Sequence, residues 1–148
     1  MSPEDTAPLQ NDPVSFHDRA AARFADEYEH LSSDYFYSAF TYGRRKLDMM
    51  LDRALRELPK DSRVLDVGCG TGDQLRKCRE AGLQVTGLEP AANMRAIAQA
   101  RNPDARILDG VITNLPFPDR AFDFVLSIEV LRYLHRSDVL LDGQHLRW

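Results

Sequence analysis

The stretch Val64-Leu65-Asp66-Val67-Gly68-Cys69-Gly70-Thr71-Gly72 decides the fold of this 148-residue chain. Its first four residues form a short, mainly apolar run, which is typical of a strand buried inside a parallel sheet. The alternating glycines that follow allow the backbone to turn sharply and allow a ligand to come close. A strand that ends in glycines and opens a helix is a nucleotide-binding arrangement. The stretch therefore predicts a ligand site at the carboxyl end of a buried strand.

The residues after this stretch continue the alternation of helices and strands. We expect helices over 73–81 and 90–101, the first of them ending before Gly82. The apolar runs predict strands over 84–88, 105–108 and 122–128, with a rigid proline-containing loop over 115–119. Alternation of this kind predicts an α/β fold, with a parallel sheet covered by helices on both faces.

Two further helices are expected before the first strand. The first has a capping box at Ser15–Asp18 and an apolar stripe made of Phe16, Ala20, Ala21, Phe24, Ala25 and Tyr28. The second covers about 44–58 and has an apolar face made of Leu47, Met50, Leu51, Leu55 and Leu58. We therefore divide the chain into a flexible tail (1–13), an N-terminal helical cap (14–60) and an α/β domain (61–148).

Composition excludes several classes of protein. The chain is 43% apolar, enough for one core, and no apolar run approaches the roughly 20 residues that span a bilayer. Met1–Asp5 is acidic and precedes no apolar segment, so we expect a cytoplasmic protein with no membrane partner. The net charge of −4 makes a nucleic-acid partner unlikely. Neither the two cysteines nor the four histidines have metal-ligand spacing, so no metal site is expected.

The charges around the glycines select the type of nucleotide. Glu89 closes the next strand, near the roughly 20-residue spacing expected for an acid that accepts hydrogen bonds from ribose hydroxyls. Asp73 stands where a dinucleotide fingerprint has its third glycine, and Asp66 adds a second carboxylate. Two like charges 4 Å apart cost on the order of 4 kcal/mol at an effective dielectric of 20, whereas a helix N-terminus returns only about 0.3–1 kcal/mol to an anion. The site therefore favours S-adenosylmethionine, a cationic nucleoside without phosphate.

These residues resemble the motifs of the class I S-adenosylmethionine-dependent methyltransferases. Residues 64–72 are similar to motif I, Gly87-Leu88-Glu89-Pro90 to the motif that follows it, and Asp109-Gly110 to the acid after the third strand. Residues 115–119 with Phe122-Asp123 are similar to the stretch that enters strand four in small-molecule members. The resemblance covers about half the chain. It implies a Rossmann-like fold and methyl transfer, by in-line displacement, to an O, N or C atom of a small molecule.

The resemblance also implies a set of cofactor contacts. Asp66 would hold the amino group, Glu89 the ribose hydroxyls, and Asp109 the adenine amino group, while the glycine loop lines the methionine part. The complete set of implied cofactor-binding residues is Asp66, Gly68, Cys69, Gly70, Gly72, Glu89, Pro90, Asp109, Gly110 and Ser127.

The catalytic residues are less well defined by the sequence. No Ser-His-Asp or Cys-His grouping is present, and each histidine is by default a surface residue. Tyr133 and His135, just past the fourth strand, are candidates for a general base if the acceptor carries a proton. In relatives an aromatic side chain from the N-terminal helices often covers the cofactor, and Tyr28 or Phe24 would take that place.

The C-terminal part leaves several alternatives open. The full sheet of this family has seven strands, whereas only four are predicted here, followed by a short helix over 138–148. The fourth strand would be an unpaired apolar edge, which promotes association. A truncated gene product, a homodimer that covers the edge, and a degenerate domain that binds S-adenosylmethionine without catalysis all fit this pattern. An NAD-dependent oxidoreductase is the less favoured reading because the third fingerprint glycine is absent.

Overall fold

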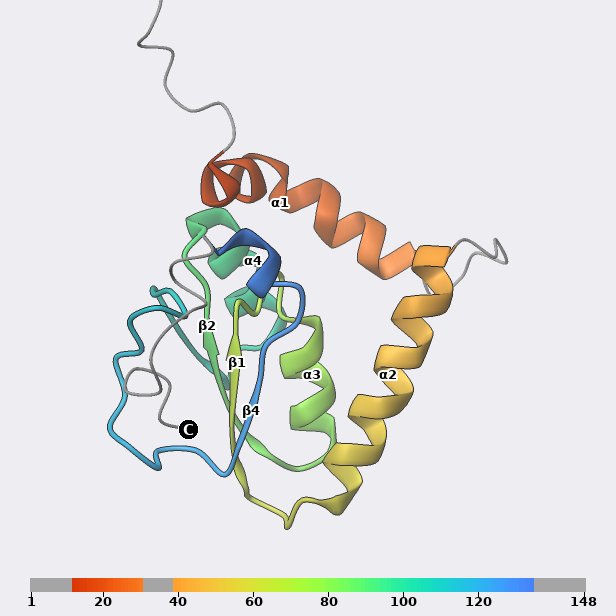
Figure 1. Cartoon of the computed structure of the whole chain (residues 1–148), viewed down its shortest axis with the longest axis vertical. Coiled ribbons are helices and arrows are strands. Elements are labelled where there is room, and N and C mark those ends of the chain that lie inside the picture. The colour runs from red at the N-terminus through yellow and green to blue at the C-terminus, as the bar shows by residue number, and fades with distance from the viewer. Residues whose placement is uncertain (1–11, 31–38, 135–148) are drawn as a thin grey trace, which may run out of the picture.

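The computed structural model describes residues 12–30 and 39–134 (Figure 1). Its helices are α1 (Pro13–His30), α2 (Ala39–Glu57), α3 (Asp73–Glu80), α4 (Ala92–Arg101) and the 3-10 helix η1 (Leu131–Tyr133). Its strands are β1 (Arg63–Val67), β2 (Gln84–Leu88), β3 (Arg106–Leu108) and β4 (Phe124–Leu126). The predicted tail up to residue 11, the predicted helix 138–148 and His135 lie outside the described residues.

The four strands form one parallel sheet in the order β3-β2-β1-β4. This confirms the predicted α/β class and all four predicted strands, although β4 has three residues where seven were expected. Asp66 on β1 lies opposite Gly87 on β2 and Leu126 on β4, so the carboxyl ends of these strands meet at one edge. Among the described residues β4 pairs with β1 alone, which leaves its other side as a sheet edge.

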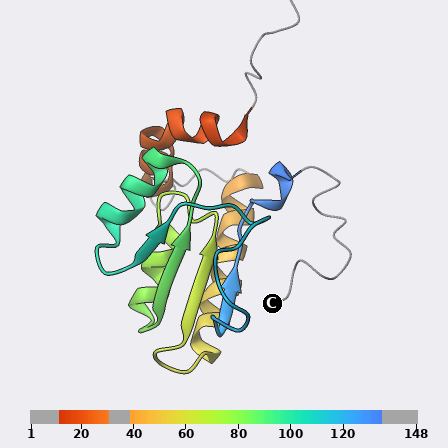
Figure 2. The same ribbon diagram turned by 90° about the vertical axis from the view of Figure 1, so that its left-hand side faces the viewer.

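The two faces of the sheet are covered differently. Val64 packs into a core with Leu51 and Leu55 of α2 and with Cys78 of α3, and α4 joins α3 on the same face through Ala98. Within the described part of the chain, the opposite face is covered by the segment 109–123, which contains the predicted loop 115–119, and not by a helix as the predicted fold requires (Figure 2). This segment can replace a helix because its apolar residues pack on the sheet: Ile112, Leu115, Phe117 and Phe122. None of the described helices is both long and apolar enough to cross a membrane.

The first helix begins and packs differently from the prediction. Its cap is Asp12, whose carboxylate accepts hydrogen bonds from the Ser15 backbone N–H (3.0 Å) and the Ser15 hydroxyl (2.6 Å), so the predicted capping box at Ser15 was wrong. The buried side of α1 contains Ala21 and packs on α4, while Phe16 is 46% exposed. Ala21 and Ala25 of the predicted stripe are buried and Phe24 packs on the same cluster as Ala21, so the prediction was wrong for the exposed Phe16.

The second helix is longer than predicted and buries a narrower stripe. It begins at Ala39, five residues before the expected start, and ends at Glu57. Leu51 and Leu55 are buried as predicted, but Met50 is 66% exposed, because a helix that packs on one side only buries positions spaced by four.

Candidate active site

A cavity of about 370 Å³ is lined by residues at the carboxyl ends of β1 and β2 and by the first residues of α1. Its volume falls in the range of small-molecule pockets. Seven of the ten predicted cofactor-binding residues line it: Asp66, Gly68, Cys69, Gly70, Glu89, Pro90 and Gly110. The other three, Gly72, Asp109 and Ser127, do not.

Asp66 is a buried carboxylate that lines the cavity. Its side chain is 2% exposed, and its Oδ2 has no hydrogen-bond partner among the described residues. Burial raises the pKa of Asp66 to about 7, and the nearby charge of Glu89 adds to the increase. A ligand cation placed here would favour the charged form of Asp66, so the position suits an ammonium group.

Glu89 lies at the carboxyl end of β2, held against the glycine loop. Its Oε2 accepts a hydrogen bond from the Gly70 N–H and its Oε1 from the Ala91 N–H, both at 2.9 Å. Burial raises the pKa of Glu89, while these two backbone hydrogen bonds act in the opposite direction. Each carboxylate oxygen keeps a further lone pair, so Glu89 can still accept hydrogen bonds from two ligand hydroxyls.

Two positions of the loop, 70 and 72, require glycine for different physical reasons. Gly70 has φ +54°, and a Cβ there would meet only the sulfur of Met94, at 3.9 Å, so the loop stays open toward the cavity. Gly72 has φ +83°, and a Cβ there would lie 2.5 Å from Nδ2 of Asn102 and 3.1 Å from the Cα of Ala98. Gly72 therefore permits the close packing of the loop on α4, which explains why it does not line the cavity.

Two acidic residues near the cavity already have cationic partners. Asp73 lies 3.5 Å from Nη1 of Arg101 and accepts a hydrogen bond from the Thr71 hydroxyl at 2.9 Å. The side chain of Asp109 is 72% exposed and pairs with Nη1 of Arg95 at 3.2 Å. The negative charge deep in the cavity therefore belongs to Asp66 and Glu89.

Cys69 and Ser127 have no arrangement that suits covalent chemistry. Burial keeps the pKa of Cys69 well above its usual value, so its thiol stays protonated at neutral pH. The hydroxyl of Ser127 is buried without a hydrogen-bond partner in the part of the chain that the structure describes.

Comparison with known proteins identifies the family. Residues 65–143 match the family described as a methyltransferase domain. The chain is 31% identical over 133 residues to an uncharacterized methyltransferase of Oceanobacillus iheyensis, covering 88% of this chain and 52% of that protein. It is 42% identical over 78 residues to malonyl-[acyl-carrier protein] O-methyltransferase of Pectobacterium atrosepticum, covering 51% of this chain and 31% of that protein. The chain thus spans about half and about a third of these two relatives.

A solved structure agrees with this assignment. The S-adenosylmethionine-dependent methyltransferase from Mesorhizobium loti is 32% identical with a TM-score of 0.50, covering 57% of this chain and 42% of that chain. The chain belongs to the class I S-adenosylmethionine-dependent methyltransferases. The family predicted from the motif residues is therefore confirmed.

In this methyltransferase chain, α1 adds a histidine to the cavity that the sequence reading treated as a surface residue. His17 lines the cavity, and its Nε2 lies 3.0 Å from the hydroxyl of Tyr133, which also lines it. The Tyr133 hydroxyl additionally accepts a hydrogen bond from Nη2 of Arg132 at 2.7 Å. Phe24 stacks on the His17 ring and packs toward α4, while the side chain of Tyr28 lies outside the described residues. Position 17 is two helical turns before Phe24, and this spacing is the one signal that could have placed it.

A second contact of the methyltransferase chain holds α1 over the cavity. The first turn of α4 has no side-chain cap of its own. Instead, Oδ1 of Asp18 accepts a hydrogen bond from the Asn93 N–H at 2.6 Å, and the Asn93 amide donates to Oδ2 at 3.1 Å. A carboxylate at a helix N-terminus is stabilising, so this contact fixes α1 at the edge of the sheet. Nothing in the sequence links two residues so far apart.

Proposed function

We propose that this chain binds S-adenosylmethionine in the cavity and transfers its methyl group to a small molecule. The observation that carries the proposal is the placement of two buried carboxylates, Asp66 and Glu89, at the carboxyl ends of adjacent strands beside the open Gly70. Family membership supports the choice of cofactor.

The residues present fit this cofactor and not a dinucleotide. An unpaired buried oxygen of Asp66 suits an ammonium, and the remaining lone pairs of Glu89 suit two ribose hydroxyls. A pyrophosphate next to the same two carboxylates would be repelled. The adenine contact proposed for Asp109 would use its second oxygen, since Oδ1 pairs with Arg95, and Asp109 does not line the cavity as Gly110 does.

The chemistry proposed for this cavity asks little of the protein's side chains. Bound S-adenosylmethionine supplies an activated methyl group on a sulfonium, which an in-line nucleophile can displace. The chain's own contribution is to hold both reactants in line, since positioning alone can lower a barrier by about 7–11 kcal/mol.

Tyr133 and His17 form the proposed general base, which would take a proton from a methyl-accepting group that carries one. Burial lowers the pKa of His17, so its ring is neutral near pH 7 and can take up a proton. We expect Tyr133→Phe to lower kcat by about 10²–10⁴-fold while leaving affinity for S-adenosylhomocysteine unchanged, because the loss concerns proton transfer. Equal losses in binding and in turnover would show that Tyr133 only shapes the site.

The acceptor is proposed to be a small molecule bound at the apolar side of the cavity. That side is lined by Val111, Ile112, Val130 and Leu134. The relative from Pectobacterium atrosepticum is named for O-methylation of malonyl-[acyl-carrier protein]. Among oxygen, nitrogen and carbon, we therefore favour oxygen as the atom that accepts the methyl group. A homodimer across the β4 edge stays a prediction, which analytical ultracentrifugation tests.

Titration calorimetry with three ligands tests the proposed function. S-adenosylmethionine and S-adenosylhomocysteine should bind with one site per chain, and NAD should not bind. Glu89→Gln should lower the affinity for both of these ligands by about 10- to 100-fold, which corresponds to the free energy of hydrogen bonds to a charged group. Glu80→Gln, an exposed acid on α3, is the matched control and should bind as the unmodified chain does. Tighter binding of NAD than of S-adenosylhomocysteine would refute the proposal.

A further inference from the structure

Gln74 has a buried side-chain amide, and none of the cofactor contacts proposed above involves it. It is the second residue of α3, it lines the cavity, and its side chain is 6% exposed. Neither its Oε1 nor its Nε2 has a hydrogen-bond partner among the described residues. Buried polar groups are almost always paired, and a buried group left without a partner costs about the free energy of its desolvation. An unpaired donor and acceptor at a cavity wall therefore point to a ligand.

A second buried amide nearby shows what a structural role looks like. Asn102 is completely buried, and it does not line the cavity. Its Nδ2 donates to the carbonyl oxygen of Gly72 at 3.0 Å and to that of Ala98 at 3.1 Å, and only its Oδ1 has no partner among the described residues. The amide nitrogen of Gln74 makes no such bond within the described chain, so packing does not explain its presence.

The groups around Gln74 define the chemistry of the missing partner. Asp66, with its unpaired Oδ2, lines the same cavity and can only accept once ionised. The amide nitrogen of Gln74 can donate, and the positive charge of Arg44, which also lines the cavity, acts on Asp66. The negative charge of Asp73 is offset by Arg101. An anion that can accept from an ammonium, together with an unpaired neutral donor and a cationic side chain in the same lining, matches a zwitterion.

We propose that Gln74 recognises the carboxylate of an α-amino-acid head group, with Asp66 taking its ammonium. The inference rests on the proposed function, which assigns the amino, ribose and adenine groups of the cofactor and leaves its carboxylate without a partner. Gln74 then makes the site specific for adenosyl thioethers that keep the complete amino acid.

Three ligands that differ only in the head group test this assignment on the full chain. S-adenosylhomocysteine has both charged groups, its decarboxylated analogue keeps only the ammonium, and 5′-methylthioadenosine has neither. The variants are Gln74→Met, Asp66→Asn and Arg44→Met, with Gln84→Met on the exposed end of β2 as the matched control. Affinities are measured by titration calorimetry at pH 8, where Asp66 is mainly ionised.

Gln74→Met should lower the affinity for S-adenosylhomocysteine by about 10- to 100-fold and leave the affinities for the other two ligands unchanged. Asp66→Asn should weaken S-adenosylhomocysteine and the decarboxylated analogue, and leave 5′-methylthioadenosine unchanged. Equal effects of Gln74→Met on all three ligands, or no effect on any, would overturn the inference, as would a carboxylate effect confined to Arg44→Met.

Two further measurements keep the test decisive. Gln74→Glu keeps the shape of the side chain and replaces the donor with an anion, so it should weaken S-adenosylhomocysteine without weakening the decarboxylated analogue. Thermal unfolding shows whether Gln74→Met is folded, and we expect its Tm to be at least that of the unmodified chain because an unpaired buried amide has been removed. If none of the ligands binds the unmodified chain, the proposed function itself fails.

Discussion

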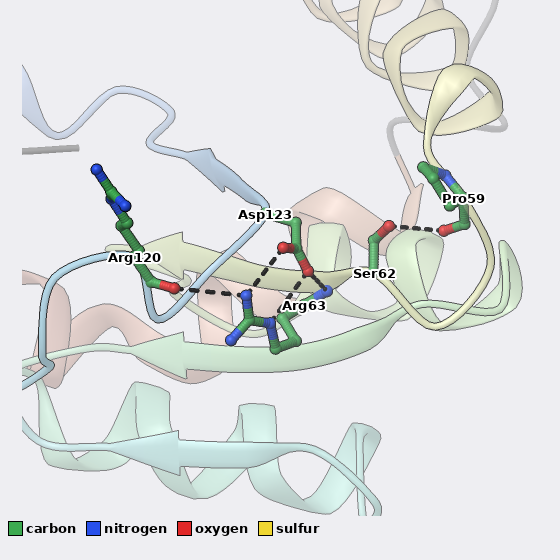
Figure 3. A network of polar contacts seen from close by, with 5 residues as sticks. All are labelled: Pro59, Ser62, Arg63, Arg120 and Asp123. Carbon is green, nitrogen blue, oxygen red and sulfur yellow. Dashed lines mark hydrogen bonds and ion pairs between the residues drawn. The ribbon is translucent and has the colours of Figure 1, made fainter.

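The charged residues at the two ends of the sheet differ in whether they have hydrogen-bond partners. At the amino end, Arg63 opens β1 and Asp123 precedes β4, and their side chains form a two-point contact with Nε–Oδ2 at 3.1 Å and Nη2–Oδ1 at 2.9 Å (Figure 3). The Arg63 N–H also donates to Oδ2 of Asp123 at 2.8 Å. At the carboxyl end, Asp66 of the same β1 strand is buried with an oxygen that has no partner among the described residues.

The pKa values of the two aspartates move in opposite directions as a result. The hydrogen bonds from Arg63 lower the pKa of Asp123 to about 2, whereas burial raises that of Asp66 to about 7. The amino end therefore joins two neighbouring strands through satisfied, exposed charges. The carboxyl end holds the charge of Asp66 at a cost to folding, which the charge of Arg44 reduces and a bound cation would reduce further. The two aspartates of the sheet therefore differ in role: Asp123 supports the scaffold, and Asp66 lines the ligand cavity.

The largest effect is expected at Gly72, where the ligand end is packed on α4. Gly72→Ala should lower the free energy of unfolding by about 2–5 kcal/mol, because it adds overpacking against Asn102 and Ala98 to a left-handed backbone. Gly82 has nearly the same φ, +81°, but a Cβ there meets nothing within 4 Å. Gly82→Ala should therefore cost only about 1–2 kcal/mol in urea unfolding. Equal losses would show that backbone strain alone, and not packing, requires glycine at position 72.

The next effect concerns the buried charge of Asp66. Its folded pKa of about 7 exceeds its ordinary value of 3.8, so its contribution to stability is complete below pH 3.8 and is lost as pH rises through 7. The loss approaches the order of 4 kcal/mol well above pH 7. Asp66→Asn should remove most of this dependence, which makes the variant more stable than the unmodified chain at pH 8 while it binds S-adenosylhomocysteine less well. Parallel stability curves for the two proteins between pH 4 and 8 would contradict the assigned burial cost.

The same carboxylate predicts the pH dependence of ligand binding. Because a ligand ammonium requires ionised Asp66, affinity for S-adenosylhomocysteine should rise between pH 6 and pH 8 and level off above the pKa of about 7. The slope is at most tenfold per pH unit. In calorimetry, Asp66→Asn should flatten this profile, whereas 5′-methylthioadenosine should show no such rise even with the unmodified chain.

The smallest effect is expected at the amino end. The lowered pKa of Asp123 means that its stabilising contribution is present above pH 3.8 and is lost as pH falls through 2. Asp123→Asn should reduce the Tm slightly at pH 7 and flatten the acid limb of the stability curve, with the difference shrinking at high salt. Asp119→Asn, an exposed acid in the same loop, serves as the control. A larger loss from Asp119→Asn would mean that Asp123 does not join the two strands as described.

Local patterns were sufficient for the elements of the sheet and for the glycine loop. β2 has the predicted boundaries, and the observed boundaries of β1, α3 and α4 lie within two residues of the predicted ones. These limits are set by glycines and apolar runs in the adjacent sequence. The start of α2 and the exposure of Met50 and Phe16 were not predictable in this way, since they depend on which neighbour each helix meets.

The sequence by itself determined that this chain belongs to an α/β methyltransferase family and has acids at the ends of its first two strands, because the motif residues are contiguous and their backbone demands are local. The tertiary structure alone decided that His17 meets Tyr133 at the cavity, that Asp18 caps a helix it does not belong to, and that Gln74 is buried without a partner. The physical reason is that pairing and burial are properties of separate segments brought together, and no pattern within one segment records them.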